Sequence, residues 1–267
     1  MEIPPPPTRS GDRVDLAKST PRRAEITSLC RESALPVLQA LASNPHLEER
    51  DVLFLLERKD LPAEVVSALG QRADARRSAA VQLALVRHPK SPRQVSLGLI
   101  KGLYVFDLLR VTQTPGVPAE VQLAAEEAIL RKTEGLPRGE RITLARRGTG
   151  RLAASLLITS DLELIRAALE NPYLTEGHLV KLLARTGLPP ALVEYLAQHE
   201  QWSNRYNVRL ALIRNPLTPL ARVLTFLPDM AVGDLRDTCL DRRLPEPLRK
   251  YLKGHCADRL KKSSQGA

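Results

Sequence analysis

The chain has 267 residues, with 40 Lys and Arg against 30 Asp and Glu, and a net charge of +10. Hydrophobic residues make up 43% of it but aromatic residues only 3%, so Leu, Ala and Val are expected to fill the core. It has no run of about 18 apolar residues, so no membrane span is expected. An odd count of three cysteines argues against a complete disulfide framework, and we expect a reduced, cytoplasmic protein.

The first twelve residues are rich in proline and polar side chains. Residues 4–7 are four consecutive prolines, followed by Thr, Arg, Ser and Gly. This composition is typical of an extended linker, and it lacks the apolar stretch of a secretory signal peptide. Residues 1–12 are therefore expected to form a disordered tail.

From residue 13 onward the sequence repeats itself. Residues 40–49 read ALASNPHLEE, and residues 167–176, which lie 127 positions later, read AALENPYLTE. The alignment continues at this offset without a gap as far as residue 125, after an offset of 128 near the start. Agreement over such a length predicts a tandem duplication. The predicted domains are the first copy at residues 13–139, the second at 140–260, continuous with the first, and a basic disordered tail at 261–267.

Asn-Pro pairs mark the corners of the repeat and predict helix–corner–helix joints. Asn tolerates the left-handed conformation that commonly closes a helix, and the Pro after it disfavours α geometry at that Asn. Thr175 then caps the next helix. Variants occur at residues 88–92 and 215–219, where Ser or Thr is expected to cap and Pro to take the first helical position.

Between these corners the apolar residues follow a helical period, and no stretch alternates with the period of a strand. In the first copy we expect helices at residues 49–58, 62–72, 74–87 and 118–132. Each helix is too short to be stable alone, so stacking must bury its apolar face. The predicted fold is all-α: a right-handed α-solenoid, or HEAT-like superhelix, built from the tandem duplication.

The rhythm A-L-x-x-N-P-x-x-T-x-x-x-L-x-x-L accompanies Asn44-Pro45, Asn171-Pro172 and Asn215-Pro216. It resembles the HEAT-like and leucine-rich-repeat-variant class of bacterial α-helical repeat proteins, over roughly residues 14–260. This resemblance implies a fold of stacked helices but no reaction. Repeat-variant proteins can carry a Cys-rich iron–sulfur segment before the repeats, and because this chain lacks one, no cluster is expected.

Residues that could support catalysis or metal binding do not form a recognisable pattern. The five histidines are scattered, and the adjacent His255 and Cys256 would point away from each other on a helix. No nucleophile elbow and no phosphate-binding loop of the G-x-x-x-x-G-K type is present. We therefore expect no catalytic residues, no cofactor and no metal. An enzyme whose site forms only in three dimensions, such as a lyase, remains an open alternative.

Aromatic residues are concentrated in the second copy, which holds six of the nine. Trp202 and Tyr206 are four residues apart, as on one helix face, with Arg205 and Arg209 beside them. These rings either fill gaps between helices, as buried aromatics usually do, or anchor a partner surface. On the second interpretation the chain is a non-enzymatic scaffold or adaptor that binds a partner protein through these four residues.

A basic segment at residues 138–151 supports an alternative function. It contains five arginines and one glutamate, and Arg146, Arg147 and Arg151 surround two glycines before an expected helix. Backbone donors at a helix start could hold a phosphate there. With the basic C-terminal tail, this predicts a HEAT-like protein that binds nucleic acid. Some HEAT-like proteins are DNA glycosylases, so the resemblance also admits an enzyme of that kind.

Overall fold

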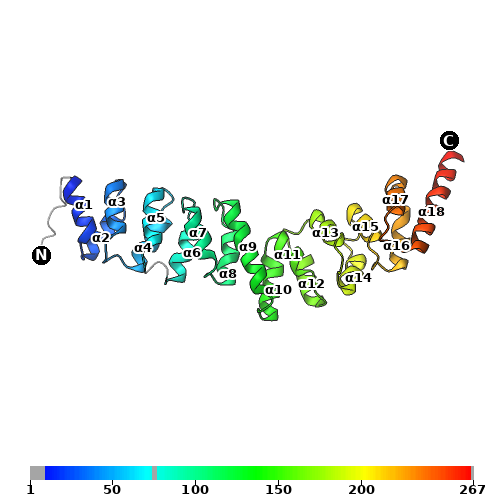
Figure 1. Cartoon of the computed structure of the whole chain (residues 1–267), viewed down its shortest axis with the longest axis horizontal. Coiled ribbons are helices and arrows are strands. Elements are labelled where there is room, and N and C mark those ends of the chain that lie inside the picture. Colours follow the sequence, from blue (N-terminus) through cyan, green and yellow to red (C-terminus); the bar gives the residue numbers. More distant parts are fainter. Residues whose placement is uncertain (1–9, 74–76, 266–267) are drawn as a thin grey trace. The chain divides into compact units, whose positions relative to one another are not determined.

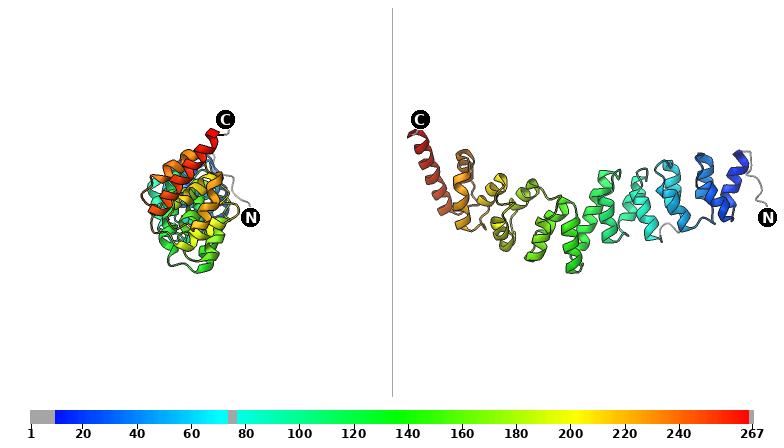
Figure 2. Two further views of the ribbon diagram at one scale, coloured as in Figure 1. Left: turned by 90° about the vertical axis from the view of Figure 1, so that its right-hand side faces the viewer. Right: turned by 180° about the vertical axis from the view of Figure 1, so that it is seen from behind.

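The structure is a computed structural model that describes residues 10–73 and 77–265. Within these residues the chain forms eighteen α-helices, one short 3-10 helix (η1, Leu227–Asp229) and no strand, which confirms the predicted all-α class. None of the described helices is both long enough and apolar enough to cross a membrane. The chain divides into two compact units, residues 1–135 and 136–267 (Figures 1 and 2).

Each unit contains nine α-helices within the described residues. The first unit holds α1 (Ser10–Ser19), α2 (Arg23–Leu29), α3 (Leu35–Ala42), α4 (Glu49–Glu57), α5 (Ala63–Gln71), α6 (Ala79–Arg87), α7 (Arg93–Ile100), α8 (Val105–Thr112) and α9 (Ala119–Thr133). The second holds α10 (Arg138–Arg147), α11 (Gly150–Leu156), α12 (Leu162–Leu169), α13 (Glu176–Leu183), α14 (Pro190–Gln198), α15 (Tyr206–Ile213), α16 (Leu220–Phe226), α17 (Val232–Cys239) and α18 (Glu246–Gln265).

The helix starts repeat at the spacing of the sequence copies. α10 begins 128 residues after α1, and every later helix of the second unit begins 127 residues after its counterpart in the first. Within each unit, helices pack on the helix two places further along the chain, as α1 does on α3 and α10 on α12. Figure 1 shows these neighbours side by side. The apolar faces of short helices are thereby buried between successive layers.

The corner asparagines link these layers through their side chains. Asn171 is 3% exposed, and its Nδ2 donates to the carbonyl oxygens of Ala145 (2.7 Å) and Gly148 (2.9 Å) at the end of α10. Its Oδ1 accepts from the backbone N–H of Tyr173 at 2.7 Å. One amide therefore accepts a hydrogen bond within its own turn and donates to two carbonyl oxygens at the end of a neighbouring helix.

Asn44 repeats this arrangement in the first unit. Its Nδ2 donates to Ala17 O at 2.9 Å and Thr20 O at 3.1 Å, and its Oδ1 accepts from His46 N at 2.7 Å. The expectation of a left-handed residue at these corners is wrong, because no described non-glycine residue has a positive φ. At these corners the Asn side chain instead makes three hydrogen bonds with the backbone.

The later corner of each copy uses either Asn or His. Asn215 Nδ2 donates to Leu183 O at 2.9 Å, and its Oδ1 accepts from Leu217 N at 3.0 Å. At the same place in the first unit, His88 Nε2 lies 2.9 Å from Arg58 O, and His88 Nδ1 accepts from the backbone N–H of Lys90. The neutral imidazole therefore makes the same two kinds of contact as the amide.

Several predicted boundaries need correction. Thr175 caps α13 as expected, but α7 and α16 begin at Arg93 and Leu220, so the proline before each is at the N-cap and not at the first helical position. The helix predicted at 74–87 begins later than expected, at Ala79, because Ser78 is its N-cap and accepts from the backbone N–H of Val81; residues 74–76 lie outside the described residues. The longest described helix is α18. α18 reaches Gln265, so residues 261–265 are helical and not disordered.

The other predicted domain limits are not tested by these observations. Most of the predicted N-terminal tail, residues 1–9, lies outside the described residues, and α1 begins at Ser10. The predicted copy boundary at residues 139–140 lies inside α10, a few residues after the point where the two units separate.

Replacing Asn171 with Ala should lower the free energy of unfolding of the second unit by about 2–4 kcal/mol, because two carbonyl groups lose their donor. Chemical denaturation followed by circular dichroism measures the change. The matched control is Asn207→Ala on α15, since that exposed side chain makes no hydrogen bond with the described residues, and it should change stability by less than about 0.5 kcal/mol. Equal effects of the two substitutions would contradict the linking role of the corner amide.

His88 should make the first unit less stable in mild acid. Burial lowers the pKa of His88 from its ordinary value of 6.5, so the unfolded chain binds the proton more readily than the folded chain. The contribution of the neutral His88 to the free energy of unfolding is then fully present above the pKa that His88 has in the unfolded chain. It is lost as the pH falls below about 6.5. The His88→Asn variant copies Asn215 and should lose this contribution. The measurement is the difference in unfolding free energy between pH 7.5 and pH 5.5; the same difference in both proteins would refute the assignment.

Candidate functional site

Trp202 is held inside the second unit. It is 6% exposed, and its indole Nε1 donates to Leu169 O at 3.1 Å. It lies in the turn between α14 and α15, because α15 begins at Tyr206. The expectation that Trp202 and Tyr206 share one helix face is therefore wrong. Trp202 links the turn to the end of α12 and fills the space between helices.

Tyr206 and Arg209 also make contacts within the unit. The Tyr206 hydroxyl donates to Asp234 and accepts from Ala231 N, and the bond to Asp234 raises the pKa of the tyrosine. Arg209 Nη1 lies 2.6 Å from an Asp229 carboxylate oxygen, its Nε donates to Ser203 O, and its guanidinium lies over the ring of Phe226.

Arg205 differs from these three residues. Its side chain is exposed and has no partner among the described residues. The geometry of Trp202 and Arg209 favours the interpretation in which they fill gaps between helices, whereas Tyr206 is 40% exposed and makes its contacts at the surface. A direct role of these four residues in partner binding stays a prediction.

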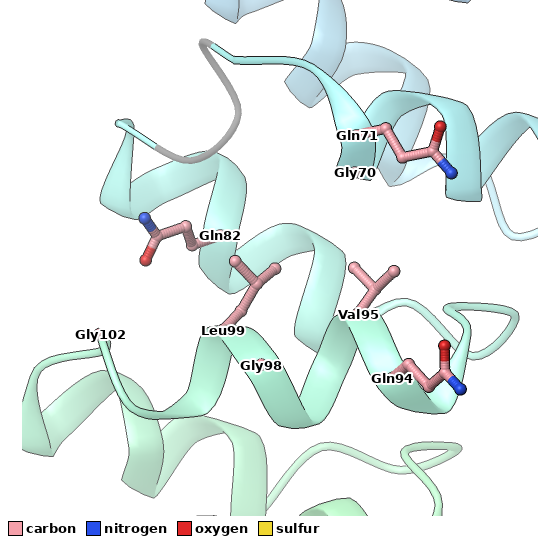
Figure 3. A pocket seen from close by; sticks show the side chains of 8 residues that line it. All are labelled: Gly70, Gln71, Gln82, Gln94, Val95, Gly98, Leu99 and Gly102. Atoms are coloured by element: carbon pink, nitrogen blue, oxygen red, sulfur yellow. The ribbon is translucent and has the colours of Figure 1, made fainter.

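The first unit has a hollow where the second has the Arg209 cluster (Figure 3). At the position of Arg209 it has Gln82, and Leu99 and Gly102 stand where the second copy has Phe226 and Asp229. These smaller side chains leave a cavity of about 410 Å³. The described residues that line it are Gly70, Gln71, Gln82, Gln94, Val95, Gly98, Leu99 and Gly102, none of which is charged.

The basic segment is partly neutralised by carboxylates. Arg138 pairs with Asp161 at 2.6 Å and with Glu163 at 2.8 Å, and its hydrogen bonds hold the pKa of Asp161 below the ordinary range. Arg146 lies 3.6 Å from Glu170. Arg146, Arg147 and Arg151 are all exposed on α10 and at the start of α11.

The two glycines of this segment have structural explanations. A Cβ on Gly150 would lie 2.1 Å from Tyr173 O, and one on Gly148 would lie 2.5 Å from Leu144 O. Both positions therefore require glycine for close packing at the corner, whether or not an anion binds. Anion binding by Arg146, Arg147 and Arg151, and with it binding of nucleic acid, stays a prediction.

A groove between α16 and the start of α18 was not predicted from the sequence. It measures about 420 Å³, and its lining has far more apolar than polar surface. Leu220, Leu224 and Tyr251 are 59%, 39% and 51% exposed there. We call it the α16–α18 groove; it is lined by Pro216, Thr218, Leu220, Leu224, Pro245, Pro247, Leu248 and Tyr251.

Beside the groove, the second copy lacks an ion pair that the first copy has. In the first unit, α7 packs closely on α9, and Arg93 of α7 forms an ion pair with Glu120 of α9. The aligned residues of the second copy are Leu220 and Pro247, which cannot form such a pair. Among the described residues, α16 and α18 make far fewer contacts than α7 and α9.

Tyr251 adds an aromatic side chain where the first copy has Ala124. Its ring stacks on His255 with the planes 14° apart. The eight described lining residues offer apolar contacts, and none of them carries a carboxylate, a thiol or an imidazole. Comparing the two copies position by position could have found the groove in the sequence, because an Arg–Glu pair is replaced by Leu and Pro.

Replacing Trp202 with Ala should destabilise the second unit by about 3–5 kcal/mol, because a buried ring and its hydrogen bond are lost. Thermal and urea unfolding measure the effect. Arg205→Ala is the neighbouring control and should change stability by less than about 0.5 kcal/mol. A Trp202→Ala protein as stable as the native chain would contradict the internal role of the indole.

Comparison with known proteins adds no family to this description. No protein-family model, curated protein or solved structure matches the chain. Within the described residues, no group of three or more His, Cys, Asp or Glu side chains could hold a metal ion. The resemblance to HEAT-like and repeat-variant proteins therefore stays a prediction.

Proposed function

We propose that this protein is a helical-repeat scaffold that binds another protein through the α16–α18 groove. The observation that carries the proposal is the gathering of Leu220, Leu224 and Tyr251, all exposed, in one apolar groove. Clustered apolar side chains at a surface mark interaction sites, whereas single ones are ordinary. The proposal moves the docking surface away from the residues around Trp202, which make contacts inside the fold.

A protein partner fits this groove better than a small polar ligand. Two helices form its walls and the first-copy equivalents of these helices pack on each other, so the groove is the place where a helical contact is missing. Grooves between helices commonly receive the apolar face of a further helix. The lining supplies mainly apolar surface and the hydroxyl group of Tyr251, since the Thr218 hydroxyl is buried and donates to Leu212 O at 2.6 Å.

The proposal includes the finer fold and location expected from the sequence. The layers would continue as a right-handed α-solenoid, for which the packing of each helix on the second one along gives support. A cytoplasmic location is proposed with it, consistent with the buried, unpaired thiols of Cys30, Cys239 and Cys256.

The difference between the two copies allows a direct test of the proposed groove. In the double variant Leu220→Arg/Pro247→Glu, the second copy receives the Arg–Glu pair of the first, which should close the groove without changing the net charge. Proteins bound to the immobilised chain in native extract are compared by mass spectrometry. We expect the double variant to lose a partner that the native chain retains.

The matched control is Arg93→Ala/Glu120→Ala, which removes the pair from the first copy and should keep the partner. Circular dichroism and unfolding curves establish that both variants fold. If the closed-groove variant retains every partner of the native chain, the proposed docking surface is wrong.

A further inference from the structure

We infer that another cavity of the second unit binds a small carboxylic acid, whose carboxylate pairs with arginine and whose apolar body packs on leucine and proline. This site is separate from the α16–α18 groove, since Pro216 is the one described residue that lines both. The cavity measures about 290 Å³, near the lower end of the range for ligand sites. We call it the arginine cavity; its lining includes Arg185, Gly187, Arg214, Pro216, Leu217 and Arg243.

In the first unit, the arginine at the position of Arg185 is paired with a carboxylate. Arg58 Nε and Nη2 donate to the two carboxylate oxygens of Asp60 at 3.2 Å and 2.7 Å. Arg58 Nη1 also donates to the carbonyl oxygens of Cys30 and Glu32, both at 2.7 Å. All three terminal nitrogens of this guanidinium therefore have acceptors within their own unit, and the carboxylate receives two hydrogen bonds from one arginine.

The second copy keeps this arginine and lacks its carboxylate. Arg185 is aligned with Arg58, but Gly187 stands at the position of Asp60. Arg185 is exposed, and its guanidinium makes no hydrogen bond or ion pair with the residues that the structure describes. A guanidinium that lacks an internal acceptor at the edge of a cavity can bind a ligand carboxylate through two parallel hydrogen bonds.

Two further arginines line the cavity, from the ends of α15 and α17. Arg243 Nη2 lies 2.7 Å from an Asp241 carboxylate oxygen, and its Nη1 donates to Ala184 O at 3.3 Å. Arg214 Nε donates to the Thr238 hydroxyl. Hydrogen bonds from Arg243 lower the pKa of Asp241, and the charge of Arg214 adds to this effect. Among the described residues, only Arg243 of these three arginines has an ion-pair partner, so Arg185 and Arg214 offer positive charge to a ligand.

The remaining lining is mainly apolar, and its largest apolar side chains are Leu183, Leu188, Pro216 and Leu217. Leu217 replaces Lys90, whose Nζ donates to Asp60 O in the first unit. An apolar wall beside arginines suits a ligand with an apolar body and one anionic group. The Arg58–Asp60 and Arg243–Asp241 pairs are both with carboxylates, which favours a carboxylate as that group.

Nuclear magnetic resonance titration of the full chain tests the inference. The probe is phenylacetate, in which a carboxylate is joined to an apolar ring. Acetate lacks the ring, 2-phenylethanol lacks the charge, and phenyl phosphate carries a phosphate in place of the carboxylate. We expect phenylacetate to shift the backbone amide signals of Gly187 and Leu217, and to bind at least about tenfold more tightly than each of the other three compounds.

Substitutions of Gly187 provide a matched pair of variants. Its φ of 74° is in the left-handed region, which Asp and Asn tolerate better than most other residues. Gly187→Asp places a carboxylate beside Arg185, as Asp60 does beside Arg58, and should weaken phenylacetate binding at least about tenfold. Gly187→Asn has nearly the same shape without the charge, and its affinity should stay within about twofold of that of the native chain.

A second pair of variants tests the arginine itself. Arg185→Gln removes the charge that pairs with the ligand and should weaken phenylacetate binding about tenfold. Arg205→Gln removes an exposed arginine of the same unit that does not line the cavity, and should leave the affinity unchanged. Circular dichroism establishes that all four variants fold.

Three outcomes overturn the inference. The first is equal affinity of Gly187→Asp and Gly187→Asn for phenylacetate, and the second is no binding to the native chain at about 10 mM. Tighter binding of phenyl phosphate than of phenylacetate shows a phosphate site and is the third. Partner capture by the α16–α18 groove is a separate measurement, so either proposal can fail while the other holds.

Discussion

The structure depends on one interaction: a buried asparagine amide that ties a corner to the preceding layer. Short helices leave unsatisfied carbonyl groups at their ends, and a stack of such helices multiplies this cost. At Asn44 and Asn171 a single side chain supplies two donors to a neighbouring helix end and one acceptor to its own turn. The layers are therefore held in register by hydrogen bonds as well as by Leu and Ala packing.

The two copies keep this frame while their surfaces differ. Lys132 donates to Leu103 O in the first unit, and Arg259 donates to Met230 O at the aligned place in the second. Elsewhere the same positions hold different groups: a glutamine-lined hollow in the first unit corresponds to the Arg209 cluster in the second. The two units therefore share a frame and differ in the side chains that they present on it.

Much of the fold could be predicted from the sequence, because its signals are local. Apolar periodicity and prolines place three of the four helices predicted in the first copy to within one residue at each end, and the 127-residue offset recurs in the helix starts. The backbone at the corners could not be predicted from the Asn-Pro pair. The pair indicates a helix end, but whether Asn provides a left-handed residue or a side-chain link depends on the helix packed against it.

The candidate site was harder to predict because exposure depends on tertiary packing. Trp202 and Arg209 have the residue types of an interface anchor, yet the indole reaches Leu169 and the guanidinium reaches Asp229. At the groove the Arg–Glu pair of the first copy is replaced by Leu220 and Pro247, a difference that is visible only when the copies are compared. Residue types indicate what a side chain can do, and packing decides whether it is available.

Backbone hydrogen exchange measured by nuclear magnetic resonance tests the central claim most directly. The amides of His46, Tyr173 and Leu217 lie in turns, where exchange is ordinarily fast, but each donates to the Oδ1 atom of a buried corner asparagine. The account predicts that these three amides exchange far more slowly than the amide of Gly187 in a turn of the second unit. Exchange of all three at the rate of Gly187 would contradict the claim that the corner amides hold the layers together.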